Sequence, residues 1–104
     1  MDRKEAYRKA SSYVALAKAV IPLQKAVLFG SYVSGMPEEH SDIDIGLFVN
    51  SLADGEYWDK VVSLQSLTRK VDVRIEPHLF IRGEDKSGFG EEVEKKGVVI
   101  EENR

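Results

Sequence analysis

Two short stretches of the sequence suit phosphate and metal chemistry. Gly30-Ser31 ends one apolar run, and Asp42 and Asp44 flank Ile43 where the next apolar run begins. In a strand, residues two positions apart point to the same side, so we expect the two aspartates to project together. Neighbouring carboxylates repel unless a cation lies between them, and Mg²⁺ prefers oxygen ligands. The aspartate pair is therefore a candidate metal site at a strand end.

A purely structural explanation of the aspartates stays open. Asp42 could cap a turn and Asp44 could be an ordinary exposed strand residue, because Asp-x-Asp is a weak motif by itself. Against this, Asp44 lies within the otherwise apolar stretch 43–49. Aspartate is disfavoured in strands and costly to bury without a partner. Metal ligation would explain why it stands there.

A turn before the aspartates adds an independent feature. The apolar run at residues 26–29 stops at Gly30-Ser31, and Gly35 follows shortly after, which suits a tight turn into a short helix. Backbone N–H groups exposed in such a turn can bind phosphate oxygens, and the Ser31 hydroxyl adds a donor. A plain strand-to-helix turn has the same pattern. Together with the aspartates, the turn predicts a site for a nucleoside triphosphate with Mg²⁺.

A third acid is expected on a later strand. Charged and apolar residues alternate over residues 71–76, which predicts a half-buried strand closed by Pro77. If this strand neighbours the strand of the aspartate pair, Asp72 or Glu76 could complete a carboxylate triad. A solvated strand face with charges of both signs is the alternative. The sequence does not choose between the two acids.

The elements that must position these residues follow from apolar spacing. The pattern predicts helices over 2–20, 56–69 (with Asp54 as N-cap) and 89–96, and strands at 26–29, 43–49, 71–76 and, as an edge strand, 98–100. This order predicts one mixed sheet packed by helices, an α/β or α+β domain spanning residues 1–104. His40 and His78 are expected on the surface or in loops, and Tyr57 and Trp58 in the core or at a partner interface.

Composition excludes several classes of protein. The chain has 104 residues, 42% hydrophobic, which predicts a single globular domain. It has no Cys, which excludes a disulfide scaffold, a thiolate zinc site and a cysteine nucleophile, and fits a reducing cytoplasm. A net charge of -3 gives no basic field for nucleic acid. No apolar run approaches the roughly 18 residues of a membrane span, and no signal peptide is evident, so we expect a cytoplasmic protein.

Gly30-Ser31 followed by Asp42-Ile43-Asp44 resembles the signature of the minimal nucleotidyltransferases, which belong to the DNA polymerase β-like nucleotidyltransferase superfamily. The order of elements is also similar. The resemblance implies a small mixed sheet with helices against one face. It implies that Gly30 and Ser31 hold the triphosphate, and that Asp42 and Asp44 ligate two Mg²⁺ ions. Asp72 matches the third acid of the family, which ligates a metal and helps to deprotonate the attacking hydroxyl.

The chemistry that this resemblance implies is in-line attack of an acceptor hydroxyl on the α-phosphorus of ATP, with pyrophosphate leaving. The chain leaves little room for an acceptor domain and has no basic patch for a long nucleic acid. In the minimal family the acceptor is typically a helical HEPN-domain toxin, whose tyrosine receives AMP and is thereby silenced. By resemblance, this chain would be the antitoxin of such a pair.

One departure from the family pattern keeps other functions open. Many relatives carry a basic residue in the turn, in a form like Gly-Ser-x-Ala-Arg-Gly, but Val33-Ser34 stands there in this chain. Lys25, Arg74 or His40 could compensate. If none does, the chain would be a weak or inactive nucleotidyltransferase-fold module that neutralises its partner by occlusion. Transfer to a small-molecule hydroxyl is a third alternative.

Overall fold

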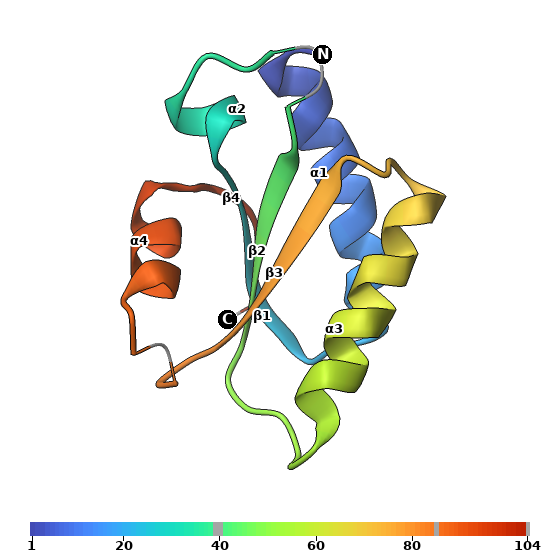
Figure 1. The fold of residues 1–104 in the computed structure, drawn as a ribbon, viewed down its shortest axis with the longest axis vertical. Coiled ribbons are helices and arrows are strands. Elements are labelled where there is room, and N and C mark those ends of the chain that lie inside the picture. Colours follow the sequence, from blue (N-terminus) through green and yellow to red (C-terminus); the bar gives the residue numbers. More distant parts are fainter. Residues whose placement is uncertain (39–40, 85, 104) are drawn as a thin grey trace.

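A four-stranded mixed sheet forms the centre of the fold (Figure 1). The computed structural model describes residues 1–38, 41–84 and 86–103. Its elements are α1 (Arg3–Ala17), β1 (Leu23–Phe29), α2 (Ser31–Ser34), β2 (Ile43–Val49), α3 (Glu56–Leu67), the 3-10 turn η1 (Thr68–Lys70), β3 (Ile75–Ile81), α4 (Phe89–Lys96) and β4 (Val98–Glu102). The predicted order is confirmed, and α2 is the short helix expected after the Gly30-Ser31 turn.

The strand order places the predicted site at the ends of the two central strands, β1 and β2. The order is β3-β2-β1-β4, so β4 is an edge strand as predicted. β1 pairs antiparallel with β2 and β4, whereas β2 and β3 are parallel. A parallel pair needs a long crossover, and α3 with η1 supplies it. The register sets Asp44 between Phe29 of β1 and Glu76 of β3.

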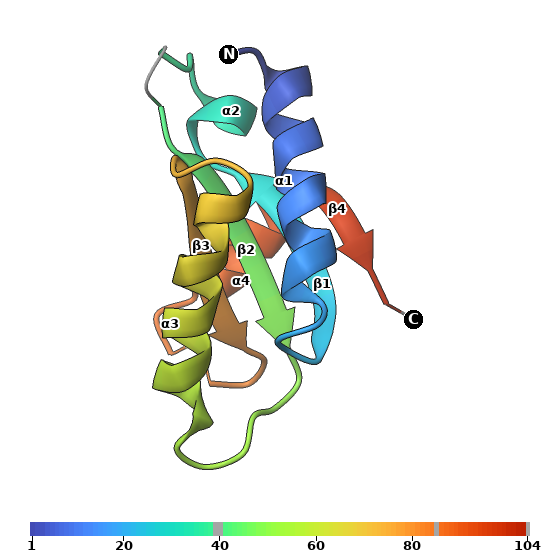
Figure 2. The ribbon, with the colours of Figure 1, turned by 90° about the vertical axis from the view of Figure 1, so that its right-hand side faces the viewer.

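Helices cover both faces of the sheet. α1 and α3 pack on one face, and α4 lies on the other (Figure 2). The expectation of helices against one face therefore holds for α1 and α3 and is wrong for α4. The larger core lies under α1 and α3, where the buried Tyr13 phenol donates a 2.6 Å hydrogen bond to the Leu64 carbonyl and joins the two helices. Within the described ranges, no helix has both the length and the apolar character of a membrane span.

Gly46 allows α4 to lie close against the sheet. The smaller core on this face consists of Val27, Phe48 and Val93, with Phe29 and Phe80 packed against it. A β-carbon at Gly46 would lie 2.9 Å from Cγ1 of Val93 and 3.2 Å from side-chain atoms of Val27 and Phe48. Because Gly46 has no side chain, α4 can approach closely the face of the sheet that carries Asp44.

The predicted strand at 71–76 is wrong in its bounds. Residues 71–74 form a turn, and β3 begins at Ile75 and continues through Pro77 to Ile81. Proline is tolerated there because β3 is an edge strand, where one side of the backbone needs no ladder partner. The predicted N-cap of α3 is also wrong, since Gly55 rather than Asp54 occupies that position.

We expect Gly46→Ala to lower the free energy of unfolding by about 1 to 3 kcal/mol, because the added methyl group overpacks the contact between α4 and the sheet. Urea unfolding followed by circular dichroism measures the change. Gly35→Ala is the matched control, since a β-carbon there meets only ordinary contacts of 3.4 Å or more. Equal stability of the two variants would contradict this account of the packing.

Candidate metal and nucleotide site

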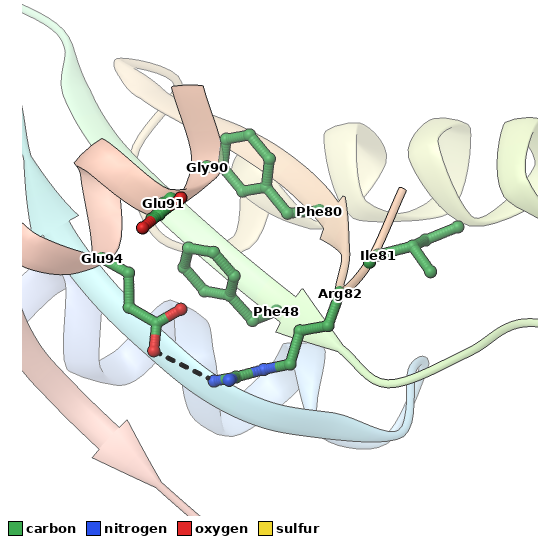
Figure 3. A pocket seen from close by; sticks show the side chains of 8 residues that line it. Phe48, Phe80, Ile81, Arg82, Gly90, Glu91 and Glu94 are labelled. Carbon is green, nitrogen blue, oxygen red and sulfur yellow. Dashed lines mark hydrogen bonds and ion pairs between the residues drawn. The ribbon is translucent and has the colours of Figure 1, made fainter. Parts of the chain in front are cut away.

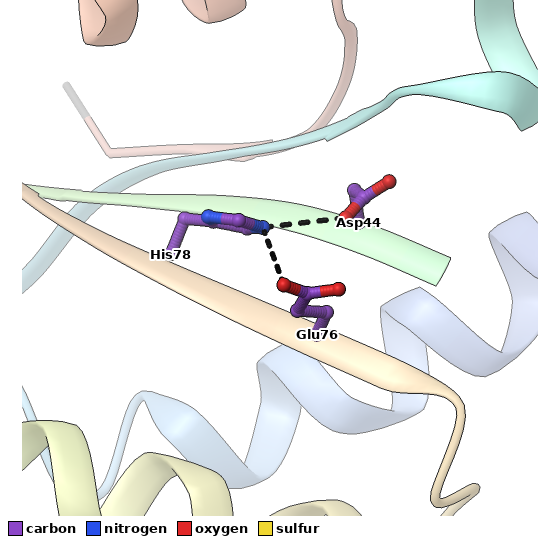
Figure 4. A group of neighbouring side chains, drawn as sticks. All are labelled: Asp44, Glu76 and His78. Carbon is purple, nitrogen blue, oxygen red and sulfur yellow. Dashed lines mark hydrogen bonds and ion pairs between the residues drawn. The ribbon is translucent and has the colours of Figure 1, made fainter. Parts of the chain in front are cut away.

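The pairing of β2 with β3 brings three side chains together on the α4 face of the sheet (Figure 4). Asp44 lies opposite Glu76, and His78 follows two positions along β3, so it projects to the same side. The His78 Nε2 atom lies 3.2 Å from the Asp44 carboxylate and 3.9 Å from that of Glu76. One ligand atom from each residue falls within 4.8 Å of the other two.

Asp42 adds a third carboxyl group to this end of the sheet. A side-chain hydrogen bond with Asp42 raises the pKa of Glu76, and burial and the negative charge of Asp44 raise it further, while His78 opposes them. Neighbouring carboxyl groups repel unless a proton or a cation lies between them. Asp42, Asp44 and Glu76 are called the acid cluster below.

The acid cluster fits a divalent cation. Its donors are carboxylate oxygens, the ligands that Mg²⁺ prefers. The carboxyl groups of Asp42 and Asp44 next to Glu76 would supply negative charge for a cation to neutralise. An imidazole suits other metals better. The contact of His78 with Asp44 instead suits an outer partner that orients a ligating carboxylate.

The Gly30-Ser31 turn lies directly against the acid cluster. Gly30 has a φ of +80°, and a β-carbon on it would overlap the Asp44 carboxylate. Glycine is therefore required here for both its backbone conformation and the close approach. α2 begins at Ser31, and the buried ring of Tyr32 anchors it to the core. The two features singled out from the sequence thus meet in space.

Asp72 lies apart from the acid cluster, in the turn before β3. Its carboxylate accepts hydrogen bonds from Arg74 at 2.7 and 3.0 Å and from Lys9 of α1 at 2.7 Å. The hydrogen bonds from Arg74, followed by that from Lys9, hold the pKa of Asp72 well below its usual range despite partial burial. The family resemblance assigned the third acid to Asp72, whereas Glu76, the other acid that the spacing left open, is the one that lies beside Asp42 and Asp44.

His78 was not expected at the site. The sequence does contain a pattern that could have indicated it. In Glu76-Pro77-His78 the two polar residues are two positions apart, as in Asp42-Ile43-Asp44, and they share a face if Pro77 lies within an edge strand. Aromatic rings surround it as well. The His78 ring is 5.1 Å from that of Phe29 and 6.3 Å from that of Phe89 at the start of α4.

Two of the three residues considered as substitutes for the missing basic turn residue, Lys25 and Arg74, have carboxylate partners. Lys25 lies 3.2 Å from Glu94, and Arg74 lies 2.7 Å from Asp72. His40 lies outside the described residues. The contacts of Lys25 and Arg74 are therefore those of structural ion pairs.

A pocket lies further along β2, under α4 (Figure 3). It has a volume of about 260 Å³. Phe48 and Phe80 stack in it at 5.0 Å, and Arg82 lies 3.2 Å from Glu94 and 5.7 Å from the centre of the Phe48 ring. The charges of Arg82 and Glu94 offset each other in this pocket, whereas the acid cluster contains carboxyl groups only.

Comparison with known families agrees with this geometry. A family model described as polymerase beta, nucleotidyltransferase matches residues 14–104. The chain belongs to this nucleotidyltransferase family. A Methanocaldococcus jannaschii protein that is provisionally named a protein adenylyltransferase is 32% identical over 79 residues, which cover 75% of this chain and 79% of the relative.

Solved structures share the nucleotidyltransferase fold. A provisionally assigned nucleotidyltransferase from Sulfolobus solfataricus superposes with a TM-score of 0.69 at 18% identity, over 97% of this chain and 84% of the other. A mutant of the toxin–antitoxin pair MntA–HpeT gives a TM-score of 0.57 at 24% identity, over 88% of this chain and 71% of the other. These similarities confirm the predicted small mixed sheet with packed helices.

We expect Asp72→Asn to lower the free energy of unfolding by about 2 kcal/mol at pH 7, because charged hydrogen bonds of a mostly buried carboxylate are lost. The pKa of Asp72 is depressed in the folded state, so its contribution is present above the unfolded pKa of about 3.9 and shrinks as the pH falls below it. Urea unfolding of both proteins at pH 7 and pH 3 measures this. An equal difference at both pH values would contradict the ion-pair role.

Proposed function

We propose that this nucleotidyltransferase transfers AMP from ATP to a hydroxyl group of a partner protein. The observation that carries the proposal is the meeting of the Gly30-Ser31 turn with the acid cluster at one end of the sheet. Membership of the nucleotidyltransferase family supports the class of reaction. The name of the Methanocaldococcus jannaschii relative supports a protein as the acceptor.

In this proposal each part of the site has one role. The backbone of Gly30 and the hydroxyl of Ser31 bind the triphosphate. The acid cluster holds Mg²⁺, and two such ions when bound would neutralise the phosphates and the developing charge. His78 keeps the Asp44 carboxylate oriented through their 3.2 Å contact.

The proposed transfer is an in-line displacement. The acceptor oxygen forms a bond to the α-phosphorus as the bond between that phosphorus and pyrophosphate breaks. The hydroxyl proton passes to the carboxylate of Glu76, which takes the part that the family resemblance gave to Asp72. Because the groups are held in place before reaction, positioning and charge neutralisation supply most of the rate.

The proposed partner is a HEPN-type helical toxin, which would be silenced when one of its tyrosines receives AMP. This chain would then be the antitoxin and act in the cytoplasm. The fold shared with the MntA–HpeT pair is compatible with that role. The net charge of -3 disfavours a long nucleic acid as the acceptor.

A second candidate function, occlusion of the partner without transfer, rests on the missing basic residue of the turn at residues 30–35. Val33-Ser34 stands where a basic residue would face the phosphates, and both Lys25 and Arg74 have carboxylate partners instead. A chain with weak triphosphate affinity could neutralise its partner by covering it. Such a module would bind the partner as a stable complex without modifying it.

Label transfer from ATP separates the two functions. We expect label from [α-³²P]ATP with Mg²⁺ to appear on the protein encoded by the neighbouring gene, and Asp44→Asn to lower this transfer at least about 100-fold, because a ligand of the cation is lost. Circular dichroism should show an unchanged fold. Asp54→Asn, at an exposed position before α3, is the matched control and should keep full activity. A stable complex without label would contradict the transfer and support occlusion.

A further inference from the structure

We infer that the acceptor polypeptide docks in an uncharged groove along the open edge of β3, with Trp58 as its anchor. The groove has a volume of about 270 Å³. It runs between α3, β3 and the start of α4, and its lining includes Tyr57, Trp58, Val61, Pro77, His78 and Phe89. This inference rests on the proposed transfer to a protein, and it specifies where that protein binds.

Trp58 is presented to solvent beside an anchored tyrosine. It is 73% exposed, and Val62, one helical turn later, is 64% exposed. The Trp58 ring packs edge-on against Tyr57 with centroids 5.2 Å apart, and the Tyr57 phenol donates a 3.3 Å hydrogen bond to the Leu79 carbonyl. Tryptophan is among the residues most often found as anchors of protein interfaces.

The groove is continuous with the acid cluster. His78 lines the groove and also lies 3.2 Å from the Asp44 carboxylate and 3.9 Å from that of Glu76. Phe89, which is 49% exposed, forms the α4 side of the groove with its ring 6.3 Å from that of His78. A segment bound beside Trp58 can therefore extend one side chain past His78 to the acids.

The in-line geometry of the proposed reaction favours the acceptor over the nucleotide as the occupant. The attacking oxygen and the leaving pyrophosphate must lie on opposite sides of the α-phosphorus. Gly30 follows β1, the acid cluster lies at the start of β2 and β3, and the groove opens beyond β3. With the triphosphate held at the Gly30 side, the hydroxyl enters from the β3 side.

The lining of the groove indicates the chemistry of the occupant. Apart from His78, the described residues that line it have aromatic, aliphatic or amide side chains, with no Lys, Arg, Asp or Glu among them. A polyanion such as RNA would need basic side chains here. The groove instead fits an apolar segment of a polypeptide that carries the acceptor hydroxyl.

The test uses the whole chain with the protein encoded by the neighbouring gene as the acceptor probe. We expect Trp58→Ala to raise the KM for this acceptor at least about tenfold and to weaken the complex similarly in calorimetry, as for an anchor residue. The kcat and the binding of a fluorescent ATP analogue with Mg²⁺ should stay within about twofold. Val99→Ala, which truncates an exposed apolar side chain on β4 at the other sheet edge, is the matched control and should change neither.

The outcomes separate the docking surface from the proposed function. Transfer with an unchanged acceptor KM in Trp58→Ala would overturn the docking surface and leave the function standing. Weaker binding of the ATP analogue with an unchanged acceptor KM would assign the groove to the nucleobase and also overturn it. A complex that Trp58→Ala weakens, without any label in the wild type, would support the docking surface and overturn the transfer. Neither complex nor label in the wild type would overturn both.

Discussion

Mutual repulsion among the carboxyl groups of Asp42, Asp44 and Glu76 is the constraint on which the rest of the structure depends. Three acids that converge at one end of the sheet oppose folding unless a cation or a proton lies between them. A hydrogen bond with Asp42, burial and the negative charge of Asp44 raise the pKa of Glu76, which favours a proton on that carboxyl group when no cation is bound. The remaining fold must therefore hold β2 and β3 in register against this repulsion. A cation bound between the carboxyl groups would replace their repulsion with attraction to the cation and would stabilise the same arrangement.

Several contacts distant from the acid cluster supply that rigidity. The core under α1 and α3 buries the opposite face of the same strands. Asp72, held by Lys9 and Arg74, fixes the turn before β3, and the Arg74 carbonyl accepts a 2.9 Å hydrogen bond from the Ile43 N–H at the start of β2. Asp72 thus helps to set the register that places Glu76 beside Asp44. Asp72, which the family resemblance assigned to the metal ions, thus has the contacts of a structural residue in the turn that precedes β3.

Most of the fold and half of the site could be predicted from local patterns. The apolar runs of β1 and β2, the periodicity of the helices and the Gly30-Ser31 turn depend on neighbouring residues, so the sequence displays them directly. The ends of β3 could not be predicted in this way. Charged and apolar residues alternate over 71–76, which is typical of a strand although residues 71–74 form a turn, and Pro77 is typical of a strand end although β3 continues past it. The ion pair of Asp72 with Lys9 joins residues far apart in the chain, and no spacing rule shows it. Glu76 and His78 become visible as a pair only when the register of β3 is known.

The central claim is that Glu76, rather than Asp72, completes the metal-binding acids. Electron paramagnetic resonance of Mn²⁺ titrated into the folded protein tests it most directly, because Mn²⁺ takes the same oxygen ligands as Mg²⁺. The account predicts that Glu76→Gln weakens Mn²⁺ binding at least about tenfold, while Asp72→Asn changes it by less than about twofold, as expected for loss of a ligand and of a residue outside the site. Normal Mn²⁺ affinity in Glu76→Gln together with its loss in a folded Asp72→Asn would contradict the account.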